Sequence, residues 1–140
     1  TRDNLRIVSD IGSRLPIYCT SQGKVFLAHM SRTSAEALLR AQHMTQFTPH
    51  TITDLTALMQ EIDLCRADGY AIETGEYKIG LRSISAPVYT VEGKARYTVG
   101  VIGMFRSTRS DEFLAAVEQV CATASMISTA LGYRKTEELL

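Results

Sequence analysis

The sequence predicts one α+β domain over residues 1–140, with helices packed against an antiparallel sheet. Helical periodicity fills the first half, strand-like segments fill most of the second, and a last helical pattern follows. A hydrophobic content of 45% in 140 residues supports one core, and the chain is too short for two domains.

Three helices are expected in the first half of the chain. Thr20 or Ser21 can cap the first one. Thr33 and Glu36 have the spacing of a capping box and predict the start of a second, short helix. The third is indicated by apolar residues at helical spacing, with Gly69 as the stop: Leu55, Leu58, Met59, Ile62 and Cys65.

Alternation and β-branched residues predict the strands Leu5–Val8, Tyr70–Glu73, Ser83–Tyr89 and Ala95–Phe105, with a hairpin turn at Glu92-Gly93. The segment Ala95–Phe105 is long and apolar, so we expect it to be a central strand.

Ser110 can cap the last helix, and Gly132 stops it. Its apolar stripe consists of Phe113, Leu114, Val117, Val120, Cys121, Ala124, Ile127 and Leu131. We expect no apolar run long enough to cross a bilayer.

The charge of the chain argues against nucleic acid as a direct partner. Fifteen basic and fifteen acidic side chains cancel, and no stretch concentrates positive charge. The first residues, Thr1–Asn4, form neither an initiator methionine nor a signal peptide, so we expect a piece of a longer cytoplasmic protein that does not bind DNA by itself.

Cysteine and histidine spacing excludes the common catalytic and metal sites. Three cysteines without a CxxC pair fit free thiols in a reducing cytoplasm, and the three histidines are not spaced as metal ligands. A nucleophile pair of Cys19 and His50 lacks a group to orient the base. Gly23-Lys24 lacks the earlier glycine of a phosphate loop. We therefore expect no catalysis, no metal and no cofactor.

The start of the first helix is the best candidate for binding. Free N–H groups at Ser21 and Gln22, with the helix dipole behind them, favour an anionic or carbonyl oxygen. The alternative is a self-capped helix without a ligand.

Three blocks, residues 11–24, 69–71 and 80–88, together resemble the effector domain of IclR-type transcriptional regulators. The resemblance implies a curved sheet flanked by helices, related to GAF and PAS sensors. It also implies that a winged helix-turn-helix and the domain's opening segment lie outside this chain. Residues 18–21, 48–51 and 80–84 resemble members that sense aromatic acids such as protocatechuate or 4-hydroxybenzoate.

Position by position, the resemblance implies a ligand pocket lined by Ser21, Gln22, Glu73, Ser83, Gly100 and Ile102. Many family members have Cys and Asp where this chain has Ser83 and Glu73, which argues against a small 2-oxoacid. Helix N–H groups and the Ser83 hydroxyl would hold a carboxylate, and Gly100 would leave room for a ring. Glu73 would accept a hydroxyl at the ligand's far end.

The resulting hypothesis is a carboxylic-acid sensor, homodimeric or homotetrameric, that controls DNA binding by a domain outside this chain. One alternative is a GAF- or PAS-like sensor module of another signalling protein. A second alternative, a hydrolase using Cys19 or Ser83, lacks a nucleophile elbow.

Overall fold

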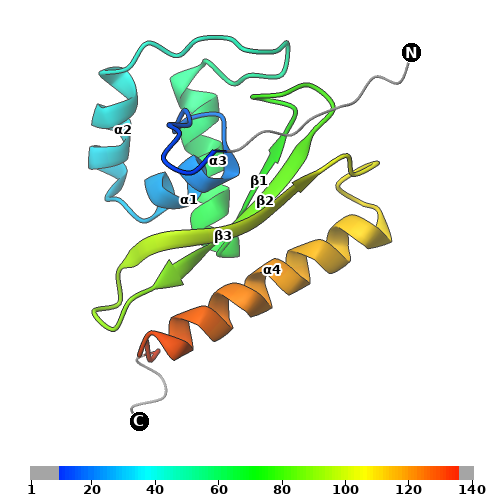
Figure 1. Ribbon diagram of the computed structural model, residues 1–140. Coiled ribbons are helices and arrows are strands. Elements are labelled where there is room, and N and C mark those ends of the chain that lie inside the picture. The colour runs from blue at the N-terminus through cyan, green and yellow to red at the C-terminus, as the bar shows by residue number, and fades with distance from the viewer. Residues whose placement is uncertain (1–9, 136–140) are drawn as a thin grey trace.

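The computed structural model describes residues 10–135, so the expected strand Leu5–Val8 lies outside the described residues. Within them, the elements follow in the order α1 (Ser21–Ala28), α2 (Arg32–Arg40), α3 (Leu55–Asp68), β1 (Ala71–Thr74), β2 (Arg82–Tyr89), β3 (Ala95–Gly103) and α4 (Asp111–Ala130). The α+β class is confirmed, and Figure 1 shows the helices on both sides of the sheet.

Local capping sets most helix boundaries. The Thr20 hydroxyl accepts from the backbone of Gly23 at the start of α1, and Gly69 ends α3 in the left-handed conformation with φ 82°. The expected capping box at Thr33 is wrong, because Ser31 caps α2 by accepting from the Ser34 N–H. Two nearby polar positions competed for this role, and Ser31 starts the helix two residues earlier than the Thr33 spacing implies.

The three strands form an antiparallel sheet in the order β1-β2-β3. The expectation that Ala95–Phe105 is central is therefore wrong within residues 10–135, where β2 is the central strand and β3 an edge. The reason is that β3 buries little of its apolar surface, since Tyr97, Val101 and Ile102 are all exposed. Apolar composition alone does not distinguish a two-sided strand from an edge strand.

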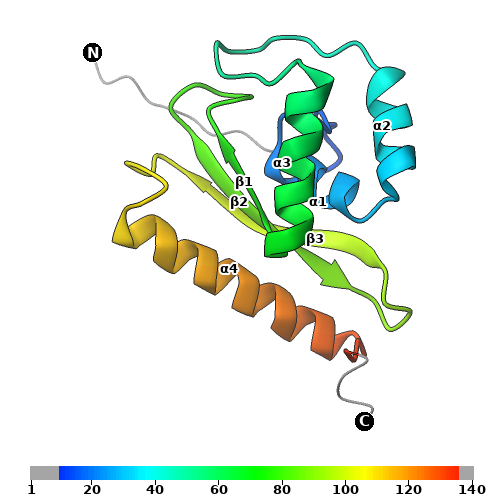
Figure 2. The ribbon, with the colours of Figure 1, turned by 180° about the vertical axis from the view of Figure 1, so that it is seen from behind.

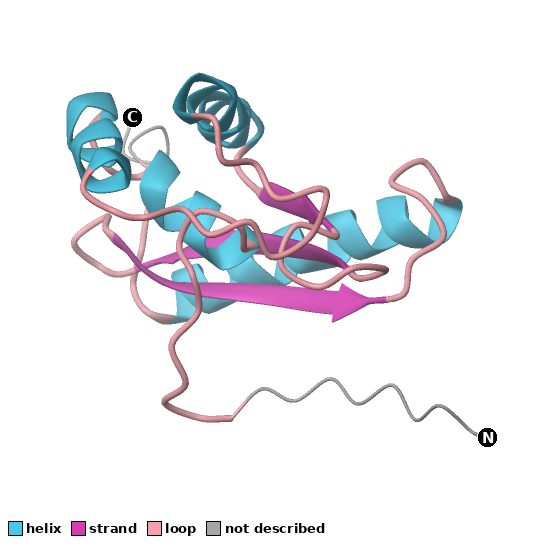
Figure 3. Cartoon of the chain, turned by 90° about the horizontal axis from the view of Figure 1, so that it is seen from above, coloured by secondary structure: helices cyan, strands magenta, loops and turns pink. Residues whose placement is uncertain are grey.

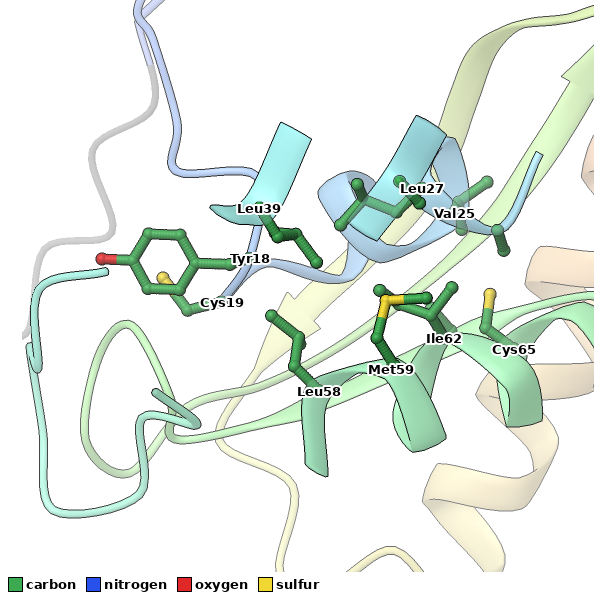
Figure 4. Packing of buried hydrophobic residues seen from close by; sticks show 12 residues of the cluster. Tyr18, Cys19, Val25, Leu27, Leu39, Leu58, Met59, Ile62 and Cys65 are labelled. Atoms are coloured by element: carbon green, nitrogen blue, oxygen red, sulfur yellow. The ribbon is translucent and has the colours of Figure 1, made fainter. Parts of the chain in front are cut away.

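The helices lie on opposite sides of the sheet and form two cores (Figures 2 and 3). The first core joins α1, α2, α3 and β1; Figure 4 shows Met59 and Ile62 of α3 facing Val25 and Leu27 of α1, and Leu58 facing Leu39 of α2. The second core joins α4 to β2 through Ile84, Ala86, Val88, Phe113, Val120 and Ala124, and Val99 of β3 packs against it. The sheet therefore separates two packing environments.

Helix α4 differs from its expected stripe. Phe113, Val120 and Ala124 are buried against the sheet, whereas Leu114 and Ile127 are exposed. The 20-residue α4 is also long and apolar enough to cross a membrane by length and composition, so the expectation that no run reaches that length is wrong. Only 22% of that apolar stretch is buried in this structure, where α4 packs against β2.

Candidate functional site

Three serine hydroxyls and one carboxylate meet where α1 begins over the sheet. Ser21 Oγ lies 2.7 Å from Ser85 Oγ and 2.9 Å from Ser83 Oγ, and Ser83 Oγ lies 3.0 Å from Glu73 Oε2. All four side chains are buried, and we call them the serine cluster. Buried polar groups of this kind are stable only when they bond to one another.

Strand alternation assembles the serine cluster. Successive residues of β2 point to opposite faces of the sheet, so Ser83 and Ser85 face α1 while Ile84 faces α4. The register of β1 with β2 places Glu73 directly opposite Ser83. Ser21 reaches them as the first residue of α1.

Glu73 is held by the turn that follows β1. Its Oε1 accepts from the N–H groups of Glu76 and Tyr77, and its Oε2 faces Ser83. The carboxylate is 4% exposed, so its acceptor sites are directed at the protein. The sequence hypothesis placed Glu73 in direct contact with a ligand, whereas in this geometry its carboxylate is bonded to Ser83 and to the turn after β1.

A buried ion pair lies behind the serine cluster. Lys24 Nζ, on α1, lies 2.7 Å from Glu76 Oε2 and 3.5 Å from Glu61 Oε2 on α3. Burial raises the pKa of Glu76, and the Lys24 ammonium opposes that rise. The turn carrying Glu76 is also tied down by Thr48 and Thr51, whose hydroxyls donate to the carbonyls of Gly75 and Glu76. Residues 48–51 therefore hold the turn that carries Glu76 in place.

The remaining predicted residues lie on the open side of the cluster. Gly100 is paired with Ser85 and Ile102 with Ser83, so both belong to the sheet face that carries the serines. Gly100 and Ile102 are exposed. Gln22 is half-buried, and its Oε1 lies 3.4 Å from Ser21 Oγ.

Gly100 permits a close approach between β3 and β2. A Cβ atom at this position would meet the carbonyl oxygen of Ile84, and it would lie 2.5 Å from Ser85 Oγ. The sequence hypothesis assigned the space over Gly100 to a ligand ring. At the Cβ position itself, that space is taken by Ser85.

Buried thiols nearby are poor nucleophiles. Burial and the carboxylates of Glu76 and Glu73 raise the pKa of Cys19 to about 12, and burial raises that of Cys65 to about 11. Cys19, Cys65 and Cys121 are free cysteines, as expected from the sequence.

A cleft of about 130 Å³ opens between α3 and β1. Its lining consists of Lys24, Glu61, Leu64, Cys65, Asp68, Tyr70, Ala71 and Ile72. None of the six predicted pocket residues is among them.

The sequence hypothesis thus named three members of the serine cluster, Ser21, Ser83 and Glu73, and missed Ser85. The alternation Ser83-Ile84-Ser85 in a predicted strand was the signal for it, since it places both hydroxyls on one face. The Lys24–Glu76 pair has no local signal, because its members are 52 residues apart.

Comparison with known proteins gives a family match along nearly the whole chain. The profile described as bacterial transcriptional regulator IclR C-terminal matches residues 1–129. The transcriptional repressor AllR of Escherichia coli K12 is 29% identical over 130 residues, which cover 93% of this chain and 48% of AllR. The chain therefore spans about half the length of this curated relative.

Solved structures give the same result. A crystal structure of the putative transcriptional regulator RHA06195 from Rhodococcus sp. RHA1 has a TM-score of 0.84 and 31% identity, covering 90% of this chain and 52% of that one. The inducer-binding domain of PobR from Acinetobacter, a double mutant in complex with 3-hydroxybenzoic acid, has a TM-score of 0.73 and 25% identity, covering 87% and 70%.

Proposed function

Since the chain is a C-terminal domain of the IclR family of bacterial transcriptional regulators, which are not enzymes, we propose that it senses a small carboxylic acid. The acid binds where α1 begins, beside the serine cluster and the exposed face of β3. Binding changes how the DNA-binding parts of the whole regulator are arranged.

The observation that carries the proposal is the meeting of Ser21, Ser83 and Glu73 beside the start of α1. The N–H groups of Ser21 and Gln22 belong to the first helical turn, which has no intrahelical acceptors for them, and the Thr20 cap takes the N–H of Gly23 instead. These two donors, with the helix dipole behind them, suit a carboxylate.

An aromatic ring is the preferred body of the ligand. Gly100 has no side chain and Ile102 is exposed on the same face, so this part of β3 offers a flat apolar surface to a ring. The PobR domain, a structural relative, is bound to 3-hydroxybenzoic acid, an acid of this class.

Two neighbouring residues of β3 test the location. Ile102 and Val101 are 47% and 41% exposed, and they face opposite sides of the sheet. Ile102→Glu places a negative charge on the face that receives the acid, whereas Val101→Glu places it on the α4 side. In a thermal-shift assay with 3-hydroxybenzoate and 4-hydroxybenzoate, the wild type and Val101→Glu gain stability and Ile102→Glu does not.

Equal ligand responses in the two glutamate variants would show that the acid binds elsewhere, and the cleft beside Lys24 would then be the next site to examine. Gly100→Leu is a poorer test, because its Cβ meets the Ile84 carbonyl and would disturb strand pairing as well as binding.

The proposal extends to assembly and location. The regulator works in the cytoplasm as a homodimer or homotetramer, and the exposed apolar residues of this domain, among them Met104, Leu114 and Met126, favour self-association. Sedimentation of the full-length protein shows dimers or larger species, and a monomer at high micromolar concentration would contradict this. DNA is bound through a domain outside residues 1–140, so a gel shift with these residues alone is blank.

A further inference from the structure

The cleft between α3 and β1 contains charged groups that the proposed acid site does not use. Its buried end is formed by Lys24, Cys65 and Ala71, and its rim carries the exposed Leu64 and Asp68. Its volume is about 130 Å³, and a cavity of about 150 Å³ is enough for one benzene molecule. The cleft therefore has room for one small ligand, with about six non-hydrogen atoms.

Lys24 brings an incompletely bonded ammonium group to the buried end of the cleft. The side chain is 1% exposed, and its Nζ donates a hydrogen bond of 2.7 Å to Glu76 Oε2. Glu61 Oε2 lies 3.5 Å from the same Nζ, which is too long for a strong hydrogen bond. An ammonium group has three hydrogens, so within residues 10–135 part of its donor capacity has no close acceptor. A ligand oxygen in the cleft would supply one.

Two carboxylates of α3 line the same cleft. Glu61 and Asp68 lie two turns apart on one face of the helix. In the part of the chain that the structure describes, Glu61 pairs with Lys24 alone and Asp68 is in no ion pair. Helix α3 ends at Asp68, so the negative end of its dipole also lies here. Because Glu76 already balances the charge of Lys24, the cleft has an excess of negative charge and favours a cationic group.

We propose that this cleft binds a small α-amino acid, with its carboxylate on Lys24 and its ammonium group between Glu61 and Asp68. An α-amino acid has its two charges on one carbon, and the opposite charges of the protein are equally close, since Lys24 Nζ and Glu61 Oε2 are 3.5 Å apart. Leu64 and Ile72 offer apolar contact to a short side chain. This second site goes beyond the proposed acid sensing, because it takes a different class of ligand and shares no lining residue with the acid site.

Alanine and two molecules that each carry one of its charged groups test the proposal. Propionate lacks the ammonium group of alanine, and ethylamine lacks the carboxylate. Each is titrated calorimetrically, up to millimolar concentration, into the full-length protein. We expect alanine to bind about tenfold or more tighter than either of the other two, since each of them loses a hydrogen bond between charged groups.

Two carboxylates of α3 give a matched pair of variants. Glu61→Gln removes a half-exposed carboxylate from the cleft and should weaken alanine binding by about tenfold or more. Asp63→Asn removes the same charge from the same helix, but Asp63 pairs with Arg32 and Arg66 and does not line the cleft. It should leave the affinity for alanine unchanged. Ile102→Glu, which blocks the proposed acid site, should also leave it unchanged, so the two sites can fail separately.

The wild-type titrations decide the question even if Glu61→Gln fails to fold. No binding of alanine would mean that the cleft holds water only, and it would overturn the inference. Propionate or ethylamine binding as tightly as alanine would overturn it as well, because one of the two charges would then not be recognised. The same holds if folded Glu61→Gln binds alanine like the wild type, or if 4-hydroxybenzoate displaces alanine from the protein.

Discussion

The two faces of strand β2 differ in chemistry although they are built from alternating residues of one short segment. Toward α4 it presents Ile84, Ala86 and Val88, which are buried among apolar side chains. Toward α1 it presents Ser83 and Ser85, equally buried but bonded to polar partners. Burial alone therefore does not identify a core.

The difference indicates a division of tasks. The α4 side contributes stability through apolar contact, which needs shape and not direction. The α1 side contains hydroxyl, carboxylate and ammonium groups, whose burial is tolerated only with partners in fixed positions. Such directional groups are suited to recognising a ligand, and we expect mutations on the two faces to behave differently.

The largest effect is expected on the apolar side. Phe113 is fully buried, and its ring packs edge-on against Phe105 with centroids 5.2 Å apart. Phe113→Ala should lower the free energy of unfolding by about 3–5 kcal/mol. Leu114→Ala, at the exposed neighbouring position, should change it by less than about 0.5 kcal/mol. Denaturant titration measures both, and similar losses would show that α4 packs differently.

Next comes the ion pair on the polar side. Lys24→Met leaves the Glu76 carboxylate buried without its cation and should lower the free energy of unfolding by about 3 kcal/mol. This is the low end for a broken buried ion pair, because Glu76 can take up a proton. The double variant Lys24→Met, Glu76→Leu should recover most of this loss. A double variant no more stable than Lys24→Met would show that the pair itself was not the cause.

A reciprocal exchange on adjacent residues of β2 compares the faces directly. Ala86→Ser buries a hydroxyl among apolar side chains and should cost about 1–3 kcal/mol. Ser85→Ala removes one link from the serine cluster and should cost about 1 kcal/mol. Thermal unfolding ranks the two variants. The reverse order would mean that the α4 side contains an acceptor that the added hydroxyl can use.

The pH dependence of stability should be the smallest effect. Burial raises the pKa of Glu76, so between the ordinary carboxyl value and the raised value the folded state holds more protons than the unfolded state. The free energy of unfolding then falls as pH rises through this window. Glu76→Gln should remove that part of the fall. Unfolding midpoints of both proteins between about pH 4 and 8 measure the difference. Identical profiles would place the titration on another group.

Local signals in the sequence were enough for most of the elements. Thr20, Asp54 and Ser110 each cap a helix with their own side chain, and Gly69 ends α3, because capping acts over three or four residues. Thr20, Ser110 and Gly69 were predicted, and Asp54 was not. The α2 cap was misplaced because Ser31 and Thr33 offer the same chemistry two residues apart.

Part of the candidate site was also predicted, through resemblance and not through physics. Ser21, Ser83 and Glu73 were named together, and in the structure Ser83 lies within hydrogen-bond distance of both Ser21 and Glu73. Ser85 was missed although the alternation Ser83-Ile84-Ser85 places its hydroxyl on the same face as that of Ser83. Its bond to Ser21, 64 residues away, follows only from the contact between β2 and α1.

By itself, the sequence determined the secondary structure and the class of the fold, because caps, turns and hydrophobic periods depend on neighbours along the chain. Only the tertiary structure decided that β2 lies between β1 and β3, that Lys24 is buried against Glu76, and that three serine hydroxyls and the Glu73 carboxylate form one hydrogen-bonded cluster. Those arrangements join residues from 10 to 64 positions apart, and strand register and helix packing, which no local pattern specifies, bring them together.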